Sequence, residues 1–509
     1  MSFARSIPAR IDGYGDVVPY AGACTAAAPC GNSGAPLSAR GDTNKLLADI
    51  AAAFDACGIR DGATLSFHHH LRNGDAVLNL VLAEAARRGL RGLTVAASSL
   101  FPVHAPLVEH LRNGVVGRIF TAYMSGPVAD AVSRGVLPVP VVMQTHGGRA
   151  RAIECGELPI DVAFVAAPAA DRCGNINGVD GRAACGPLGY AMVDARHARR
   201  VVVVTDHLVR YPACPIDITQ DQVDFVVPVD SIGDPNGILS GTTRPTSDPV
   251  GLAIATAATR VIEASGLLGP EFSFQTGAGG VSLAVAARLR ELMRARGVQG
   301  SFAAGGVTGY LCDMLDEDLF RTIFDVQCFD LKAVDSYRRD PRHLAMSASL
   351  YANPHSRGAV AHQLDVMILG AAEVDLDFNV NVTTGSSGSI LGGSGGHADT
   401  ADGSRLAIVT TRLAATGAPK IVERVGCVTT PGATIDVVVT EAGIAVNPRR
   451  DDLVRRLQDA EIELRPIDAL RRAAGRPAVA PPPSRDQGRI VAVVEYRDGT
   501  VIDVVRQVG

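Results

Sequence analysis

Three consecutive histidines, His68, His69 and His70, are followed at once by Leu-Arg-Asn-Gly-Asp. Imidazole groups can bind a metal ion, act as general bases, or contact an anion beside an arginine. A metal site needs side chains that converge on one point, whereas in a strand His68 and His70 share a face and His69 points the other way. The sequence indicates no third ligand nearby and has no H-E-x-x-H motif. We therefore predict no metal site, and interpret the histidines and Arg72 as a rim that binds carboxylate groups.

A glycine-rich segment, GSSGSILGGSGGHADTAD at residues 385–402, is the second stretch that could do chemistry. Glycines let the backbone turn sharply and direct several N–H groups into one concavity, which suits an anion or a developing oxyanion. The segment does not match a dinucleotide fingerprint or a Walker A loop. A flexible surface loop is the alternative, but a position after a strand of an α/β sheet favours ligand binding.

Two further glycine-containing stretches follow apolar runs, QTGAGG at residues 275–280 and ADRCGNING at residues 170–178. The first could open a helix and hold an anion at its N-terminus. The second makes a tight polar turn. Taken alone, the first is better explained by helix-strand packing and the second by an Asx-type turn without a ligand.

Alternating strands and helices must position these segments. Six short apolar runs between residues 64 and 205 predict strands separated by helices, and a second such series follows a long helix predicted at 249–265. This alternation predicts mostly parallel sheets with both faces covered. Residues 211–247 are rich in Pro, Gly and Asp and indicate a linker, and a last strand is expected at 488–496. We therefore predict two tandem open α/β domains, with an N-terminal arm at 1–42, a first domain at 43–247 that ends in the linker, and a second domain at 248–509.

Composition narrows the class of partner. The chain has 509 residues, a net charge of −5 and 47% hydrophobic residues. A negative net charge argues against a nucleic-acid surface. The sequence has no run of about 18 apolar residues, and its N-terminus lacks the apolar region of a secretory signal. We expect a cytoplasmic protein that does not bind a membrane or nucleic acid.

Taken in order, these segments resemble one family, the alpha subunit of citrate lyase, which is a citrate CoA-transferase. The similar stretches span nearly the whole chain and include SFHHHLRNGDAVLN, PAADRCGNIN, QTGAGG, GSSGSILGGSGGHADTADGSRLAIV and VVVTEAGIAVNPRRDDL. HHHLRNGD is the most specific of them. The glycine loop and the later T-E-x-G are similar to CoA-transferases and acetyl-CoA hydrolases at large. The resemblance implies two open α/β domains of CoA-transferase type with the active site between them.

The resemblance also implies a reaction and its partners. Citrate would replace the acetyl group on the thiol of an acyl carrier protein, the gamma subunit, to give citryl carrier and acetate. That thiol belongs to a phosphoribosyl-dephospho-CoA group on the separate carrier, with acetyl-CoA as an analogue, so this chain would carry no covalent cofactor. A beta subunit, the lyase, would then cleave citryl carrier. We also expect a homo-oligomer.

One position departs from the broader superfamily. Many CoA-transferases carry a catalytic glutamate in the second domain, and Gly309 stands in the corresponding stretch, GGVTGYLCDML. A glutamyl thioester is therefore not expected. The resemblance then implies direct attack of a citrate carboxylate on the acetyl thioester through an anhydride, which needs cations for citrate and N–H donors for oxyanions.

The resemblance gives each candidate residue a role. Asp399 and Glu441 would anchor loops rather than take part in the chemistry. The candidate site residues are Gly392, Gly393, Gly395 and Gly396 as oxyanion or thioester donors, His68, His70, Arg72 and Arg405 as ligands of citrate carboxylates, and Asn73, Gln275 and Asn353 as polar positioning groups.

Three other functions remain open at this point. The chain could be another acyl-CoA transferase or an acetyl-CoA hydrolase that uses free CoA. It could be a metal-dependent hydrolase that uses His68 and His70. It could also be a scaffold subunit without catalytic activity, which Gly309 alone would allow.

Overall fold

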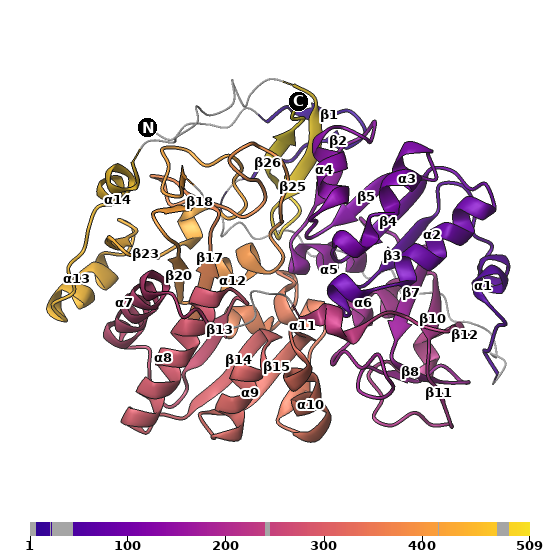
Figure 1. The fold of residues 1–509 in the computed structure, drawn as a ribbon, viewed down its shortest axis with the longest axis horizontal. Coiled ribbons are helices and arrows are strands. Elements are labelled where there is room, and N and C mark those ends of the chain that lie inside the picture. Colours follow the sequence, from indigo (N-terminus) through magenta and orange to yellow (C-terminus); the bar gives the residue numbers. More distant parts are fainter. Residues whose placement is uncertain (1–6, 21, 23–43, 240–244, 416, 476–487) are drawn as a thin grey trace.

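The computed structural model describes residues 7–20, 22, 44–239, 245–415, 417–475 and 488–509. Two large sheets lie side by side, each with helices on its faces (Figure 1). We call the part of the chain built on the nine-stranded sheet the first unit and the part built on the eight-stranded sheet the second unit. The predicted fold class, two open and mostly parallel α/β units, is confirmed.

The first sheet is parallel throughout except for its last strand, which is antiparallel to its neighbour. Its strands are short apolar runs that are buried on both faces, as expected for a parallel sheet. Their order across the sheet is β12 (Phe225–Pro228), β10 (Arg200–Thr205), β7 (Val162–Ala167), β3 (Thr64–Phe67), β4 (Leu93–Ala97), β5 (Val116–Thr121), β6 (Val141–Met143), β25 (Ile490–Glu495) and β26 (Val501–Arg506).

Helices cover this sheet in two groups. One group packs in a row, α1 with α2, α2 with α3 and α3 with α4, and the other pairs α5 with α6. The second group faces the second unit (Figure 1). The helices are α1 (Ile50–Cys57), α2 (Val77–Arg87), α3 (Leu107–Arg112), α4 (Pro127–Ser133), α5 (His146–Glu154) and α6 (Gly189–His197).

The second sheet repeats this plan. Its first seven strands are parallel and its last is antiparallel. Their order is β16 (His343–Ala345), β15 (Phe320–Cys328), β14 (Gly300–Val307), β13 (Ser273–Thr276), β17 (Val366–Gly370), β20 (Leu406–Thr410), β23 (Val437–Thr440) and β24 (Gly443–Val446). The helices are α7 (Pro249–Ser265), α8 (Gly280–Arg296), α9 (Gly309–Asp316), α10 (Leu331–Arg339), α11 (Ala348–Ala352), α12 (His397–Gly403), α13 (Asp451–Asp459) and α14 (Ile467–Ala474).

Two segments that were predicted at domain ends, the linker at 211–247 and the last strand at 488–496, differ from expectation. The predicted linker at 211–247 contains β12, which pairs in parallel with β10 and forms the edge of the first sheet. The last predicted strand does not join the second unit: β25 pairs in parallel with β6, and β26 completes the hairpin. A hydrophobic strand joins whichever edge offers unpaired backbone groups, regardless of distance along the chain. The boundary at residue 248 remains a prediction, but the final hairpin belongs to the first sheet.

The predicted N-terminal arm is described only in part, and residues 1–6, 21 and 23–43 lie outside the described residues. Within it, β1 (Arg10–Ile11) and β2 (Gly15–Asp16) form a small hairpin. Ile11 and Val17 pack on Val493 and Val501 of the C-terminal hairpin. The N-terminal hairpin therefore packs on the C-terminal hairpin that forms the edge of the first sheet (Figure 1).

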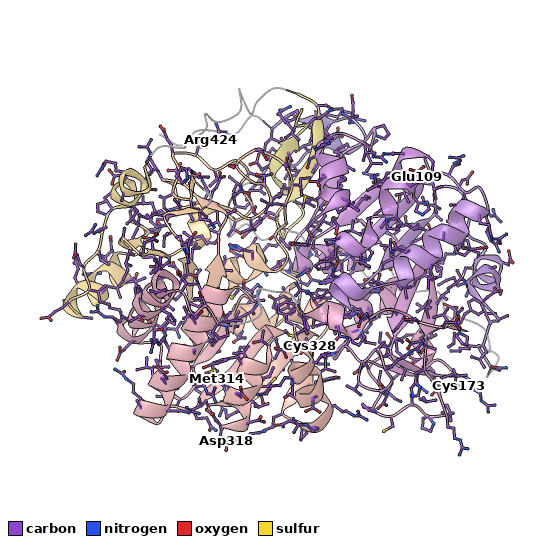
Figure 2. The ribbon with its side chains drawn as sticks, viewed as in Figure 1. Glu109, Cys173, Met314, Asp318, Cys328 and Arg424 are labelled. Atoms are coloured by element: carbon purple, nitrogen blue, oxygen red, sulfur yellow. The ribbon has the colours of Figure 1, made fainter. Side chains whose placement is uncertain are left out.

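The two units share one hydrophobic core. A single cluster of buried apolar side chains runs from α2 and β7 in the first unit to α8 and β14 in the second. At the junction, α11 packs on both α5 and α6, and α6 also contacts β15. Figure 2 shows side chains filling the space between the ribbons, with Cys328 of β15 near the boundary. The packing of α11 against α5 and α6 brings the carboxyl ends of strands from both sheets together.

Candidate active site at the junction of the two units

The glycine-rich loop of the second unit docks on the carboxyl ends of first-sheet strands. Gly395 N donates to Ala122 O, just after β5, at 3.1 Å, and Gly395 O accepts from His146 N at 2.8 Å. Met124 N donates to Gly392 O at 3.4 Å. Gly395 has a φ of +51°, in the left-handed region that favours glycine. The loop is thus held in place by backbone contacts with the other unit, unlike a flexible surface loop.

These contacts divide the loop's amides into two groups. Gly392 N donates to Thr383 O at 3.3 Å and Gly395 N to Ala122 O, so both are occupied. In the part of the chain that the structure describes, the amides of Gly393, Ser394 and Gly396 donate to no acceptor. Two of the four predicted glycine donors, Gly392 and Gly395, therefore already have acceptors, while the Ser394 amide within the same predicted Gly392–Gly396 backbone has none among the described residues.

The loop also has no room for side chains. A Cβ at position 393 would lie 2.4 Å from Ala122 O, and one at position 396 would lie 2.4 Å from the Tyr351 hydroxyl. Both distances are far below van der Waals contact. Glycine is therefore required at position 393 for the backbone to reach the first unit, and at position 396 for it to pack against Tyr351 of α11 in the second unit.

His68 does not face the junction as predicted. Its Nε2 lies 3.0 Å from Asp194 Oδ2, an ion-pair distance, although the ring N–H is not aligned for a hydrogen bond. Asp194 in turn accepts two hydrogen bonds from Arg149, at 2.8 and 2.7 Å. A buried carboxylate needs such partners. His68 therefore lies in a buried network of charged groups inside the first unit, which no local pattern of the sequence indicates.

His69 and His70, together with His146 from α5, surround the buried side chain of Tyr190. The ring centroid of Tyr190 lies 4.6 Å from that of His69, 5.8 Å from that of His70 and 4.6 Å from that of His146. The His69 ring is held by Ser98 Oγ, 2.6 Å from its Nδ1, while His70 Nε2 is buried without a hydrogen-bond partner among the described residues. His146 and Tyr190 could not be predicted as neighbours of these histidines, since each is a single residue far from the HHH stretch in the sequence.

Arg72 lies between aromatic rings from both units. Its guanidinium carbon is 5.3 Å from the centroid of Phe101 in the first unit and 4.7 Å from that of Phe329 in the second. No described carboxylate forms an ion pair with it, and burial lowers the pKa of Arg72. Its φ of +51° is unusual for a residue with a side chain. An unpaired, desolvated guanidinium in strained backbone is an arrangement typical of an anion-binding site.

Gln275 is the second candidate that the structure places with the junction residues. Its Nε2 donates to the Tyr351 hydroxyl at 2.7 Å, and its Oε1 is buried with no partner among the described residues. Tyr351 also contacts the glycine loop through position 396. Gln327 joins the units nearby, because its Nε2 donates to His69 O at 2.6 Å.

Three other candidates are not arranged as predicted. Asn73 is exposed, and its Oδ1 accepts from Val103 N at 3.0 Å, which fixes a turn. Asn353 is buried, and its Nδ2 donates to Glu154 at 2.7 Å and to Ser349 at 3.2 Å. Arg405 pairs with Asp365 at 2.9 Å, is 70% exposed, and precedes β20. Arg405 therefore lies at the amino end of the strand, roughly 16 Å from the carboxyl end at about 3.3 Å per residue.

The two predicted loop anchors do form anchoring contacts. Asp399 accepts from Thr145 Oγ1 at 2.8 Å and from Gly147 N at 2.9 Å, which ties α12 to α5. Burial raises the pKa of Asp399 to about 6, although Arg497 nearby partly offsets this. Glu441 accepts from Leu413 N at 3.0 Å. Both carboxylates hold backbone segments.

No group of three or more His, Cys, Asp or Glu side chains could hold a metal ion within the ranges that the structure describes. Over the same ranges, no helix has the length and apolar character needed to cross a membrane.

The wild-type protein is expected to lose more stability than a His70→Gln variant when the pH falls from 7 to 5. Burial lowers the pKa of His70 from 6.5 to about 3. In this window the unfolded histidine binds a proton and the folded one does not, so protonation favours the unfolded state. At pH 5 the wild type should have lost about 2 kcal/mol more of its free energy of unfolding than the variant. This follows because each pH unit below 6.5 costs about 1.4 kcal/mol. Urea unfolding of both proteins at each pH measures it.

An exposed histidine provides the matched control for this measurement. His207→Gln should leave the loss of stability between pH 7 and pH 5 as it is in the wild type. Equal losses in the wild type and the His70→Gln variant would show that His70 is protonated in the folded protein.

Comparisons with known proteins agree on one family. Residues 43–508 match the family described as citrate lyase, alpha subunit (CitF). The chain is 47% identical to the citrate lyase alpha chain of Klebsiella pneumoniae and 48% identical to that of Escherichia coli, in each case over 91% of both chains. It is also similar to the solved alpha subunit of citrate lyase from Streptococcus mutans in complex with citrate, with a TM-score of 0.94, 44% identity and coverage of 100% and 99%.

A more distant likeness concerns the fold. A Pseudomonas malonate decarboxylase hetero-tetramer in complex with malonate contains a chain that superposes with a TM-score of 0.63 at 19% identity. The likeness covers 84% of this chain and 85% of that one. The paired α/β architecture is thus shared well beyond close relatives.

Proposed function

This chain belongs to the citrate lyase alpha-subunit family, and from that premise we propose that it transfers citrate onto the thiol of an acyl carrier in exchange for an acetyl group. It is the citrate CoA-transferase subunit of citrate lyase. The observation that carries the mechanism is the docked loop with unoccupied amides at Gly393, Ser394 and Gly396. Unoccupied, rigidly held N–H groups suit the oxyanion that forms during acyl transfer.

Direct attack by citrate accounts for the groups present at the junction. A citrate carboxylate oxygen bonds to the acetyl carbonyl carbon, and the carbonyl electrons move to oxygen. Collapse of this oxyanion breaks the C–S bond and leaves an acetyl-citrate anhydride and the carrier thiolate. The thiolate then bonds to the citryl carbonyl carbon, and acetate leaves. Both nucleophiles are anions, so neither step needs a proton, and Arg72 would hold a citrate carboxylate.

The surroundings of Gly309 support a route without an enzyme carboxylate. Gly309 N donates to Asp330 Oδ2 at 2.7 Å, and a Cβ at this position would lie 2.8 Å from the side chain of Lys332. A side chain here would therefore point into a packed contact with α10. The position offers neither a carboxylate nor space for one.

The partners follow from the same premise. The acyl group would be carried on the phosphoribosyl-dephospho-CoA group of a separate gamma subunit, and a beta subunit would cleave the citryl product. The Streptococcus mutans relative was solved with citrate, which supports citrate as the substrate of this chain. We further propose a cytoplasmic homo-oligomer within that complex.

A single-turnover experiment tests both substrate and route. The chain is mixed with acetyl carrier and citrate labelled with ¹⁸O in its carboxylates, and acetate and citryl carrier are measured by mass spectrometry. Direct attack places one citrate oxygen in the released acetate during the first turnover. An enzyme carboxylate would instead supply that oxygen, so unlabelled acetate would exclude the direct route.

Two controls separate the remaining functions. Free acetyl-CoA with a different carboxylic acid should turn over far more slowly than acetyl carrier with citrate. Fast exchange in that control would indicate a general acyl-CoA transferase, and fast acetate release without any acid would indicate a hydrolase. No turnover with a competent carrier would indicate a scaffold.

A further inference from the structure

His146 lies directly against the loop that carries the unoccupied amides. It is the first residue of α5, and the preceding Thr145 caps that helix by accepting from Gly148 N at 2.8 Å. Thr145 Oγ1 also donates to Asp399, and His146 N donates to Gly395 O at 2.8 Å. The backbone of His146 is therefore fixed to both units.

The imidazole of His146 has one face covered and one edge free. Its ring stacks on that of His69, with centroids 5.7 Å apart and planes at 18°, and it contacts Tyr190. Nδ1 is buried with no partner among the described residues. Nε2 has no hydrogen-bond partner there either but is not fully enclosed, since the residue is partly exposed. A Cβ at Gly395 would lie 3.3 Å from Nε2, so this nitrogen faces the loop backbone one residue before the free amide of Gly396.

The surroundings keep this imidazole neutral. Burial, together with the positive charge of Arg149 on the same helix, lowers the pKa of His146 to about 3. A neutral imidazole has one N–H, and the proton is better placed on Nε2, where a ligand can accept it, than on the enclosed Nδ1. The result is a fixed, uncharged hydrogen-bond donor directed at the space beside Gly395.

We propose that His146 is a catalytic residue that donates its Nε2–H to the oxyanion formed during acyl transfer, beside the loop amides. The proposal rests on the proposed function. No proton is transferred: the hydrogen bond shortens as negative charge develops on the carbonyl oxygen and lengthens when the C–S bond breaks. The role resembles that of a neutral side-chain donor in an oxyanion hole.

Two amide variants distinguish the nitrogen involved. Glutamine places an amide N–H near the position of Nε2, whereas asparagine places it near Nδ1. We expect kcat to fall about 100-fold in His146→Ala, as for other single oxyanion donors. His146→Gln should recover part of this loss and His146→Asn should not, while the KM for citrate changes less than threefold in all three. His110→Gln, on α3 of the first unit, is the control and should keep wild-type kcat.

A donor that stays neutral and transfers no proton predicts a kcat that is level from pH 6 to 8, because the pKa of His146 lies well below this window. A fall in kcat below pH 7 that is present in the wild type and absent in His146→Gln would show that His146 becomes protonated there, which contradicts a neutral donor. The proposal is overturned if His146→Ala keeps kcat within threefold of wild type, or if the asparagine and glutamine variants are equally impaired. Failure of the proposed function would be seen separately, as an absence of citryl carrier with the wild-type chain.

Discussion

Replacement of Arg72 by alanine is expected to raise the KM for citrate about 100-fold. The guanidinium lies between Phe101 and Phe329 with no described carboxylate as a partner, so a ligand must supply the anion. A hydrogen bond to a charged group contributes roughly 1.5–3 kcal/mol, and the upper part of this range corresponds to about 100-fold. Initial rates against citrate concentration, with saturating acetyl carrier, measure the change.

Arg405→Ala is the matched control, because Arg405 is an exposed arginine paired with Asp365 at the far end of β20. It should leave the KM for citrate within twofold of wild type. Arg72→Lys should recover little, since lysine cannot form a planar stack between two rings or a bidentate contact. Binding of citrate at wild-type strength by Arg72→Ala, or a greater loss in Arg405→Ala, would contradict the site.

Local pattern was enough to predict most of the fold. The apolar runs at Thr64–Phe67, Leu93–Ala97 and Leu406–Thr410 form strands within the residues expected, because short β-rich runs between turn signals have few alternatives. The two units follow from the alternation of strands and helices. The glycine loop and Arg72 were predicted for the same reason: glycine content and the position after a strand are properties of the local sequence.

The features that could not be predicted depend on residues far apart in the chain. Asp194 lies more than 120 positions from His68, and no local signal connects them. β25 joins an edge that β6 provides some 350 residues earlier. In the sequence, His146 is only a residue at the start of a helix, and its place beside Gly395 depends on the fold. In each case tertiary packing, not local preference, decides the role of the residue.

The C-terminal hairpin of β25 and β26 helps to hold the glycine-rich loop in place. Arg497, in the turn between β25 and β26, is buried and donates to Asp402 at 2.5 Å and to Ala352 O at 3.0 Å. Its Nε lies 3.5 Å from Asp399, which in turn binds Thr145. The last segment of the chain therefore fixes α12, and with it the glycine loop, against the first unit. The loop's amides can be held rigidly because both units, and the end of the chain, contact it.

Replacement of Gly393 by alanine is expected to lower kcat by about 10²–10³ with little change in the KM for citrate. The new methyl group would lie 2.4 Å from Ala122 O and 2.9 Å from Tyr123 Cα, which are backbone atoms that cannot move aside cheaply. The loop must shift, and its unoccupied amides then leave the positions in which we propose that they contact the reacting carbonyl. Loss of one such donor typically costs this factor in rate. Steady-state kinetics with acetyl carrier and citrate measure it, and thermal unfolding shows how much of the effect reflects stability.

A glycine-to-alanine substitution at an unconstrained position is the control, because it shows whether the loss of kcat is specific to position 393. Gly358 is exposed, and a Cβ there meets nothing within 4 Å, so Gly358→Ala should keep wild-type kcat. The expected order is a large loss at Gly393 and none at Gly358, in proteins that remain folded at the assay temperature. A folded Gly393→Ala protein with wild-type kcat would mean that the loop amides do not contact the reacting carbonyl, because a rigid donor cannot be displaced by even a fraction of an ångström without weakening its hydrogen bond.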